Sequence, residues 1–334
     1  MRACRLQKSC LVVLAWVALF AAVGHLHVPA ADAADKVPHI RVIAVSVGEQ
    51  SEEAKAFRHG LHDAGYVEGR DICIEWWFGG GSYDRVSEAV ADLAQRTPDV
   101  IVVESTPAAL ATKKATSTIP IVMALVGDPV GSGVVASLAR PGGNITGLTN
   151  QTVDLAAKRL QLLKEAIPGA KRVVVIFNPE APFNSKVVSR LKGVAPGLGV
   201  ELKLVSVRNV KELRAAFSRL TRSNADALLI VDDASMTALE EEFLQMGLKS
   251  QLPIVYANKP LARRGVLLSY AVDHPAMFRH AAGYVVKILK AAKPSNLPIE
   301  QPTTFELVVN LKTAKALGIT IPQSILVRAD EVIR

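Results

Sequence analysis

Short runs of β-branched residues alternate with amphipathic segments along most of this chain, and this alternation restricts the fold more than any other feature. The run IRVIAVS at residues 40–46 has the composition of a buried strand. In the next segment, residues 52–64, Phe57, Leu61 and Ala64 recur at the spacing of one helix face. Strands that alternate with helices form parallel sheets covered by helices on both faces. The sequence therefore predicts an α/β fold.

The alternation continues to residue 290 and predicts two successive halves of similar build. Strands are predicted at residues 40–46, 72–76, 99–103, 119–125, 172–177, 201–207, 226–231, 254–256 and 266–269. Helices are predicted at residues 52–64, 83–95, 107–116, 154–166, 185–194, 210–221, 235–250 and 275–290. Because a chain of 334 residues exceeds one ordinary hydrophobic core, we expect two Rossmann-like lobes of roughly 120–150 residues each.

The first 34 residues have the three-part pattern of a secretory signal peptide. Arg2, Arg5 and Lys8 precede an apolar run at residues 11–23, and the alanines within residues 30–34 offer small-residue cleavage sites. The run of 13 residues is shorter than the roughly 20 residues that a spanning helix needs. We therefore expect cleavage near Ala34 and export of a soluble mature chain, with an uncleaved anchor as the alternative.

Charge and cysteine content limit the possible partners. The formal net charge is +8, the basic residues are scattered, and aromatic residues make up 5% of the chain. Because a nucleic-acid surface needs clustered basic residues, we expect no nucleic-acid partner. Cys4 and Cys10 leave with the signal peptide, so Cys73 is the one cysteine of the mature chain and an intramolecular disulfide is excluded.

Polar residues gather where the predicted strands end, and ligands of open parallel sheets bind at those carboxyl ends. Ser46 ends the first strand, and Ser105 and Thr106 follow the third. We expect Thr106 to be a helix N-cap and Pro107 to be the first helical residue. The free N–H groups and the dipole of such a helix start favour an anion, such as a ligand carboxylate. A capped helix without a ligand is the alternative.

The strand ends of the second half offer a complementary charge. Asp232 and Asp233 end a strand, where a carboxylate can hold a ligand ammonium or can simply cap the following helix. Tyr256 ends another strand and can form either a stacking wall or part of the core. The sequence thus predicts that Ser105 and Thr106 hold an anionic group while Asp232 holds a cationic one.

Residues 131–136, GSGVVA, match the formal pattern G-x-G-x-x-A of a dinucleotide-binding turn. That fingerprint normally follows the first strand of its domain, whereas the first predicted turn here reads SVGEQ. The expected helix is also interrupted by Pro141-Gly142-Gly143. The motifs G-x-S-x-G, H-E-x-x-H and C-x-x-C do not occur, and His59 and His62 lack a ligand arrangement. We therefore expect no cofactor, no metal and no catalytic residues.

Five segments together carry a family resemblance: FRHGLHDAGYVEGRDICIE, TPAALATKKATSTIPIV, GDPVGSGVVASLARPGGNITGLT, KRLQLLKEAIPGAKRVVVIFNP and FELVVNLKTAKALGITIP. The most specific of them combines Asp128-Pro129 with PGGNITG at residues 141–147. On these residues the mature chain resembles the ABC transporter substrate-binding proteins of the tryptophan/tyrosine type, which have the type 1 periplasmic-binding-protein fold.

The resemblance implies a division into two lobes joined by crossover hinge segments. Residues 38–147 with 275–310 would form the N-lobe, and residues 148–274 with 311–334 the C-lobe. The crossovers would lie at residues 144–150, at residues 266–270 and near Asn310. It also implies a periplasmic, monomeric, non-enzymatic receptor that clamps a small polar or amphipathic ligand, such as an amino acid, and delivers it to an ABC permease in the inner membrane.

Site residues also follow from the resemblance. It carries over Ser105, Thr106, Asp128, Asn184 and Ser185, so that the complete predicted ligand-binding set is Ser46, Ser105, Thr106, Asp128, Asn184, Ser185, Asp232 and Tyr256. One departure is Glu104, at a position where the family usually has a small residue, because a carboxylate there repels a ligand carboxylate unless it points away. Two alternatives remain open: a secreted α/β enzyme, either a hydrolase or a dehydrogenase, and a sensory ligand-binding module of the same fold.

Overall fold

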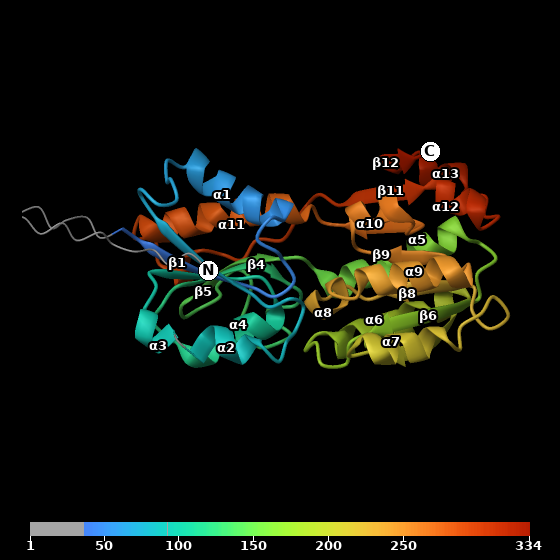
Figure 1. Cartoon of the computed structure of the whole chain (residues 1–334), viewed down its shortest axis with the longest axis horizontal. Helices are drawn as coiled ribbons and strands as arrows, with labels where there is room; N and C mark the ends of the chain where they lie inside the picture. Colours follow the sequence, from blue (N-terminus) through green and yellow to red (C-terminus); the bar gives the residue numbers. More distant parts are fainter. Residues whose placement is uncertain (1–36, 92) are drawn as a thin grey trace, which may run out of the picture.

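The computed structural model describes residues 37–91 and 93–334 and has two α/β lobes side by side (Figure 1). The predicted fold class, two mostly parallel sheets flanked by helices, is confirmed. The predicted signal peptide at residues 1–34 lies outside the described residues. Among the residues that are described, no helix is both long and apolar enough to cross a bilayer.

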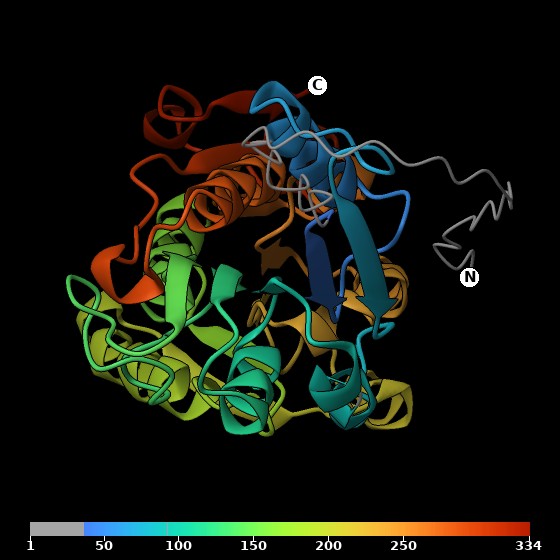
Figure 2. The same cartoon turned by 90° about the vertical axis from the view of Figure 1, so that its left-hand side faces the viewer.

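The first lobe contains a five-stranded parallel sheet in the order β2-β1-β3-β4-β5. Its strands are β1 (His39–Ala44), β2 (Cys73–Phe78), β3 (Val100–Val103), β4 (Ile121–Val126) and β5 (Ile145–Thr149). Helices α1 (Glu52–Asp63) and α11 (His274–Leu289) cover one face, and α2 (Val86–Ala91), α3 (Leu93–Arg96) and α4 (Thr106–Ala115) cover the other (Figure 2).

Alternate residues of each strand in this sheet bury against opposite layers of helices. Val100 and Val102 pack with α1 and α11, whereas Ile101 and Val103 pack with α2 and α4. Burial on both faces explains why these strands read as continuous apolar runs rather than as alternating patterns. The carboxyl ends of the strands are left free to carry polar residues.

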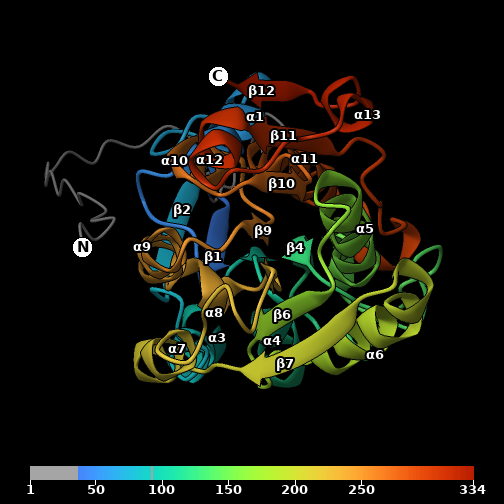
Figure 3. The same cartoon turned by 90° about the vertical axis from the view of Figure 1, so that its right-hand side faces the viewer.

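The second lobe contains a seven-stranded sheet in the order β12-β11-β10-β9-β8-β6-β7 (Figure 3), in which β11 runs antiparallel to β10. Its strands are β6 (Arg172–Phe177), β7 (Glu201–Ser206), β8 (Ala227–Ile230), β9 (Ile254–Tyr256), β10 (Leu268–Ala271), β11 (Glu306–Asn310) and β12 (Glu331–Ile333). Its helices are α5 (Thr152–Ala166), α6 (Asn184–Val194), α7 (Val210–Phe217), α8 (Ala234–Thr237), α9 (Glu240–Ser250), α10 (Lys259–Arg264), α12 (Leu311–Ala316) and α13 (Gln323–Leu326), with 3-10 turns at Pro196–Leu198 and Pro294–Asn296.

The chain crosses between the lobes after β5, after β10 and before β11. The first and third crossovers lie side by side, because the backbone N–H of Thr149 donates to the carbonyl of Glu300 at 3.1 Å and that of Glu300 donates to Gly147 at 3.0 Å. The crossover predicted at residues 266–270 lies instead at the end of β10, since Leu268 is buried and pairs with both neighbouring strands.

The predicted lobe boundaries differ from the strand pairing at two places, because β5 extends the first sheet to Thr149, past the predicted boundary at residue 147, and β11 joins the second sheet. Glu306–Asn310 was expected in the N-lobe, but β11 pairs with β10 and β12 of the second sheet. Strand β11 therefore belongs to the seven-stranded sheet of the second lobe. The rest of the division of the chain into two lobes stays a proposal.

Candidate functional site

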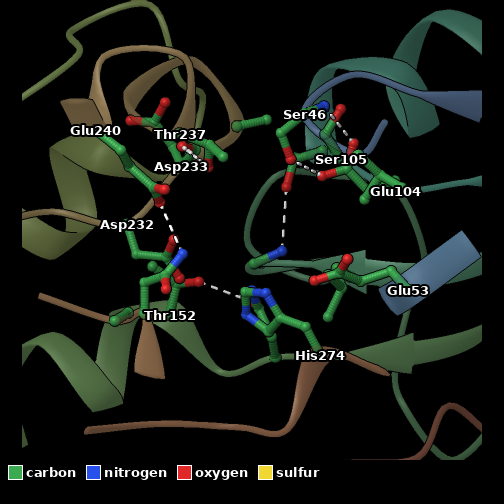
Figure 4. Close-up of a pocket in the computed structure, with 18 of the residues that line it drawn as sticks. Ser46, Glu53, Glu104, Ser105, Thr152, Asp232, Asp233, Thr237, Glu240 and His274 are labelled. Atoms are coloured by element: carbon green, nitrogen blue, oxygen red, sulfur yellow. Dashed lines mark hydrogen bonds between the residues drawn. The ribbon is translucent and has the colours of Figure 1, made fainter. Parts of the chain in front are cut away.

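A cavity of about 150 Å³ lies between the two lobes, where the carboxyl ends of both sheets meet (Figure 4). The first lobe contributes the loop after β1 and the start of α4, and the second contributes the ends of β8 and β9. Asn150, Thr152 and His274 enter from the crossovers. An engineered cavity of about this volume in another protein holds benzene, so this one has the scale of a small organic molecule.

The start of α4 forms the part of the cavity best suited to an anion. Ser105 is the N-cap in extended conformation, and its hydroxyl accepts the backbone N–H of Ala108 at 3.4 Å. Thr106, predicted as the cap, is instead the first helical residue, and its hydroxyl accepts the N–H of Gly127 at 3.2 Å. Both side chains line the cavity beside the positive end of the helix dipole.

Glu104 is buried and engaged with the end of β1. Its carboxylate accepts the backbone N–H groups of Val45 at 2.6 Å and Ser46 at 2.9 Å, and it also accepts the Ser46 hydroxyl. Burial raises the pKa of Glu104, and these hydrogen bonds act in the opposite direction. The carboxylate therefore fixes the loop after β1 and holds the hydroxyl of Ser46, although both residues line the cavity.

Asp233 is the helix cap of the adjacent pair Asp232-Asp233. One carboxylate oxygen accepts the backbone N–H of Ser235 at 2.9 Å, that of Met236 at 3.2 Å and the Tyr83 hydroxyl at 3.1 Å. The other oxygen accepts the Asn184 side-chain amide at 3.0 Å. Burial raises the pKa of Asp233, and the hydrogen bonds from Ser235, Asn184 and Met236 oppose the rise. Because Tyr83 belongs to the first lobe, this cap also joins the two lobes.

Asp232 is the member of the pair that stays available to a ligand. It lines the cavity, is half-buried, and makes no hydrogen bond or ion pair within residues 37–91 and 93–334. Nearby, the side chain of Arg159 is only 1% exposed, and its Nε donates to the carbonyl of Tyr270 at 2.7 Å. Burial lowers the pKa of Arg159, and the charge of Asp232 opposes that shift. The position can therefore receive a ligand cation.

Tyr256 is buried below the cavity surface at the end of β9. Its ring packs edge-on against Phe243 with the ring centres 5.0 Å apart, which is a core contact. Burial raises the pKa of its hydroxyl, and the neighbouring Glu240 carboxylate acts in the same direction. Tyr256 therefore packs as a core residue, one of the two roles that the sequence allowed, and it also lines the cavity, so its role as a stacking wall stays a prediction.

Five predicted site residues line the cavity, namely Ser46, Ser105, Thr106, Asp232 and Tyr256. The structure places the other three outside the lining. Asp128 accepts the N–H of Gly131 at 2.8 Å and forms an ion pair with Lys186 of the other lobe at 3.0 Å, so it lies at the rim. Asn184 is buried behind Asp233, and Ser185 is exposed on α6.

Besides Tyr83, three titratable residues line the cavity that the sequence analysis did not select: Glu53, Glu240 and His274. Each stands in the first turn of a helix, α1, α9 and α11 respectively, so a survey of helix starts in addition to strand ends finds them. The Nε2 atom of His274 is buried and has no hydrogen-bond partner within the described part of the chain. Burial raises the pKa of Glu240 to about 7, and the charges of Asp232 and Glu53 add to the shift.

Residues 131–136 form a loop at the cleft rim. In the described chain between β4 and β5 the backbone makes turns and no helix, so the helix that a dinucleotide fingerprint requires does not follow. Gly133 has a φ of +75°, a left-handed conformation that suits glycine in a tight turn. Among the described residues, no group of three or more His, Cys, Asp or Glu side chains is arranged to hold a metal ion.

Two α/β lobes joined by crossovers around an interlobe cavity define a periplasmic-binding-protein-like protein of type 1. The sequence profile described as ABC transporter substrate binding protein matches residues 40–333. The chain belongs to this family of ABC transporter substrate-binding proteins, as the resemblance in the sequence predicted.

Known proteins with similar sequence or structure agree with this assignment. The chain is 28% identical over 265 residues to a tyrosine-binding protein of Clostridioides difficile, covering 79% of this chain and 75% of the relative. An ABC domain from Streptococcus pneumonia in complex with L-Trp has a TM-score of 0.79 and 27% identity, over 88% of this chain and all of the other. A conserved domain protein from Vibrio cholerae has a TM-score of 0.82 and 27% identity, over 89% of this chain and all of the other.

Proposed function

We propose that this protein is the periplasmic receptor of an ABC importer and that it clamps an amino acid or a related small molecule between its lobes. The single observation that carries the proposal is the interlobe cavity, in which an anion-binding helix start faces an available carboxylate. The named ligands of the relatives, tyrosine and L-Trp, are zwitterions with these two charges.

In the proposed complex the ligand carboxylate binds at the start of α4 and the α-ammonium binds at Asp232. The hydroxyls of Ser105 and Thr106 and the helix dipole stabilise the anion. His274 Nε2, which has no partner among the described residues, adds a ring nitrogen for the ligand on the same side of the cleft as Glu104. Asp232 supplies a carboxylate without competing hydrogen bonds from described residues.

Contacts between the lobes support a clamp that opens and closes. The Tyr83 hydroxyl reaches Asp233, and Lys186 pairs with Asp128, each pair spanning the cleft. Such contacts exist only in the closed form, and a ligand held by both lobes stabilises that form by its differential affinity. We propose that the closed, loaded form docks on the permease as a monomer.

The binding assignment is tested by calorimetric titration of the mature chain with a panel of amino acids. We expect a saturable ligand, and we expect Asp232→Asn to weaken its binding roughly 10- to 100-fold, the usual worth of a hydrogen bond to a charged group. Asp154→Asn, an exposed carboxylate on the same lobe, serves as the control. Equal affinities of wild type and Asp232→Asn would show that Asp232 does not hold the ligand.

We further propose that binding proceeds without turnover, in line with a family whose members bind substrates for transport. Ligand recovered from the purified complex should be chemically unchanged when it is measured by mass spectrometry. Conversion of the ligand that disappears in a cleft variant would instead favour the secreted-enzyme alternative.

A further inference from the structure

The cavity is lined by an excess of acidic side chains. Among the described residues, its lining contains the carboxylates Glu53, Glu104, Asp232, Asp233 and Glu240, no Lys or Arg, and His274 as its one imidazole. Burying like charges together is costly unless they are paired or protonated. The partners of each carboxylate therefore indicate which charges the protein compensates and which are left for a ligand.

Two of the five carboxylates are compensated by the protein itself. Glu104 accepts two backbone N–H groups and the hydroxyl of Ser46. Asp233 accepts its helix N–H groups, the Tyr83 hydroxyl and the Asn184 amide. Their oxygens are engaged in holding loops and lobes, so they have little capacity left for a bound molecule.

The other three carboxylates have few partners or none. Neither Asp232 nor Glu53 makes a hydrogen bond or ion pair with any residue of the described ranges 37–91 and 93–334. Glu240 accepts the side-chain amide of Asn258 at 2.9 Å and borders the Tyr256 hydroxyl. These three groups therefore leave negative charge facing the cavity.

The three groups approach one another from opposite lobes. Asp232 follows β8 and Glu240 begins α9 in the second lobe, whereas Glu53 lies in the first turn of α1 in the first lobe. Figure 4 shows Asp232 and Glu240 on one side of the pocket and Glu53 on the other. Their mutual influence is also visible in the raised pKa of Glu240, to which both neighbours contribute after burial.

A zwitterionic amino acid with an uncharged side chain cannot compensate this arrangement. Its ammonium would occupy Asp232, whose charge Arg159 already offsets in part. Its carboxylate would add a further negative charge to a lining that has no Lys or Arg among the residues that the structure describes. Glu53 and Glu240 would then face each other across the closed cleft with no cation between them.

We propose that the native ligand is dibasic, an amino acid whose side chain ends in an ammonium or guanidinium that sits between Glu53 and Glu240. This inference rests on the proposed function as an amino-acid receptor and names its substrate class. The interlobe cavity and the substrate-binding family are the evidence that a ligand binds here. The carboxylates are evidence only for the charge of that ligand. Glu53 and Glu240 are the specificity-determining residues of this proposal.

Matched ligands test the proposal on the unmodified protein. Calorimetric titrations of the mature chain compare L-arginine with L-citrulline and L-lysine with L-norleucine, pairs of similar shape that differ in side-chain charge, and add L-tyrosine and L-tryptophan. At least one cationic member should bind roughly 10- to 100-fold more tightly than its neutral partner, as a charged hydrogen bond predicts. Tighter binding of neutral amino acids would overturn the dibasic ligand and leave the receptor function standing. No saturable binding of any of these amino acids by folded protein would overturn both.

Two variants, each with a control at the adjacent residue, test whether the preference for a cationic ligand depends on Glu53 and Glu240. Glu240→Gln and Glu53→Gln should each reduce the preference for the cationic ligand by at least about tenfold. Glu241→Gln and Glu52→Gln change exposed carboxylates one position away, which pair with Arg264 and Lys55, and should leave the preference unaltered. Thermal unfolding of each variant establishes that it is folded. A preference that survives in both Glu240→Gln and Glu53→Gln would overturn the assignment.

Discussion

The buried carboxylate of Glu240 destabilises the ligand-free protein, and this destabilisation can be measured as a pH dependence of the free energy of unfolding. Its pKa rises from the ordinary value of 4.5 to about 7, first because it is buried and then because Asp232 and Glu53 lie nearby. Below about pH 4.5 the carboxyl is protonated in both the folded and the unfolded chain, so it costs nothing. Above about pH 7 it is ionised in both, and the folded state carries the full penalty.

The size of the penalty follows from the pKa. Each tenfold change in proton affinity is worth about 1.4 kcal/mol, so a pKa of about 7 in place of 4.5 corresponds to about 3 kcal/mol. Glutamine keeps the shape and the hydrogen bond to Asn258 but cannot ionise. Glu240→Gln should therefore raise the free energy of unfolding by up to about 3 kcal/mol at pH 8 and by little at pH 4.5.

Thermal unfolding of the ligand-free protein, followed by circular dichroism at both pH values, measures this difference. For a mature chain of about 300 residues, 3 kcal/mol corresponds to about 5 °C in Tm. Glu241→Gln is the control, because Arg264 lowers the pKa of Glu241 and its loss should have a small effect of the opposite sign. A Tm difference for Glu240→Gln that is the same at pH 4.5 and pH 8 would refute the reasoning.

Two further predictions concern closure and acid stability. Gly81 has a φ of +79°, and a Cβ there would overlap that of Ala238 in the other lobe, so Gly81→Ala should weaken ligand binding by at least about tenfold. Gly80→Ala, which has a similar φ but open space around it, should keep the wild-type affinity in the same titration. Arg172 lowers the pKa of Asp226 from 3.8 to about 2, so the pair stabilises the fold above pH 3.8 and loses that contribution as the pH falls through 2. Asp226→Asn should cost about 1–2 kcal/mol at pH 7 after discounting for solvent around the exposed arginine, and chemical denaturation should show the difference vanishing near pH 2.

Most strands could be predicted because burial on both faces leaves an unmistakable composition. The run at Arg172–Phe177 was predicted with the bounds that the structure shows. Helix interruptions were harder to predict, because they depend on local capping. Residues 235–250 were expected to form one helix, but Asp233 caps the short α8 and a second helix begins at Glu240. The break directs Glu240 toward the cleft.

The candidate site could be predicted in outline, but not the direction of individual side chains. Of the adjacent pair, Asp232 was the predicted ligand carboxylate, but only the folded chain shows that Asp233 caps its own helix while Asp232 lines the cavity without a protein partner among the described residues. The direction of Glu104 was also open until its hydrogen bonds to Val45 and Ser46 were seen. His274 enters through a crossover, a position that depends on how the lobes are joined.

Carboxylates contributed by both lobes make closure itself depend on the charge of the ligand. Glu53 belongs to the first lobe and Glu240 to the second, so closing the cleft without a cation brings like charges together in a partly desolvated space. A cation between them replaces repulsion by attraction, and only the closed form gains from it. Because a ligand shifts a conformational equilibrium by no more than its differential affinity for the two states, this arrangement supplies a physical basis for selection. A neutral isostere would occupy the open cleft and leave the lobes apart.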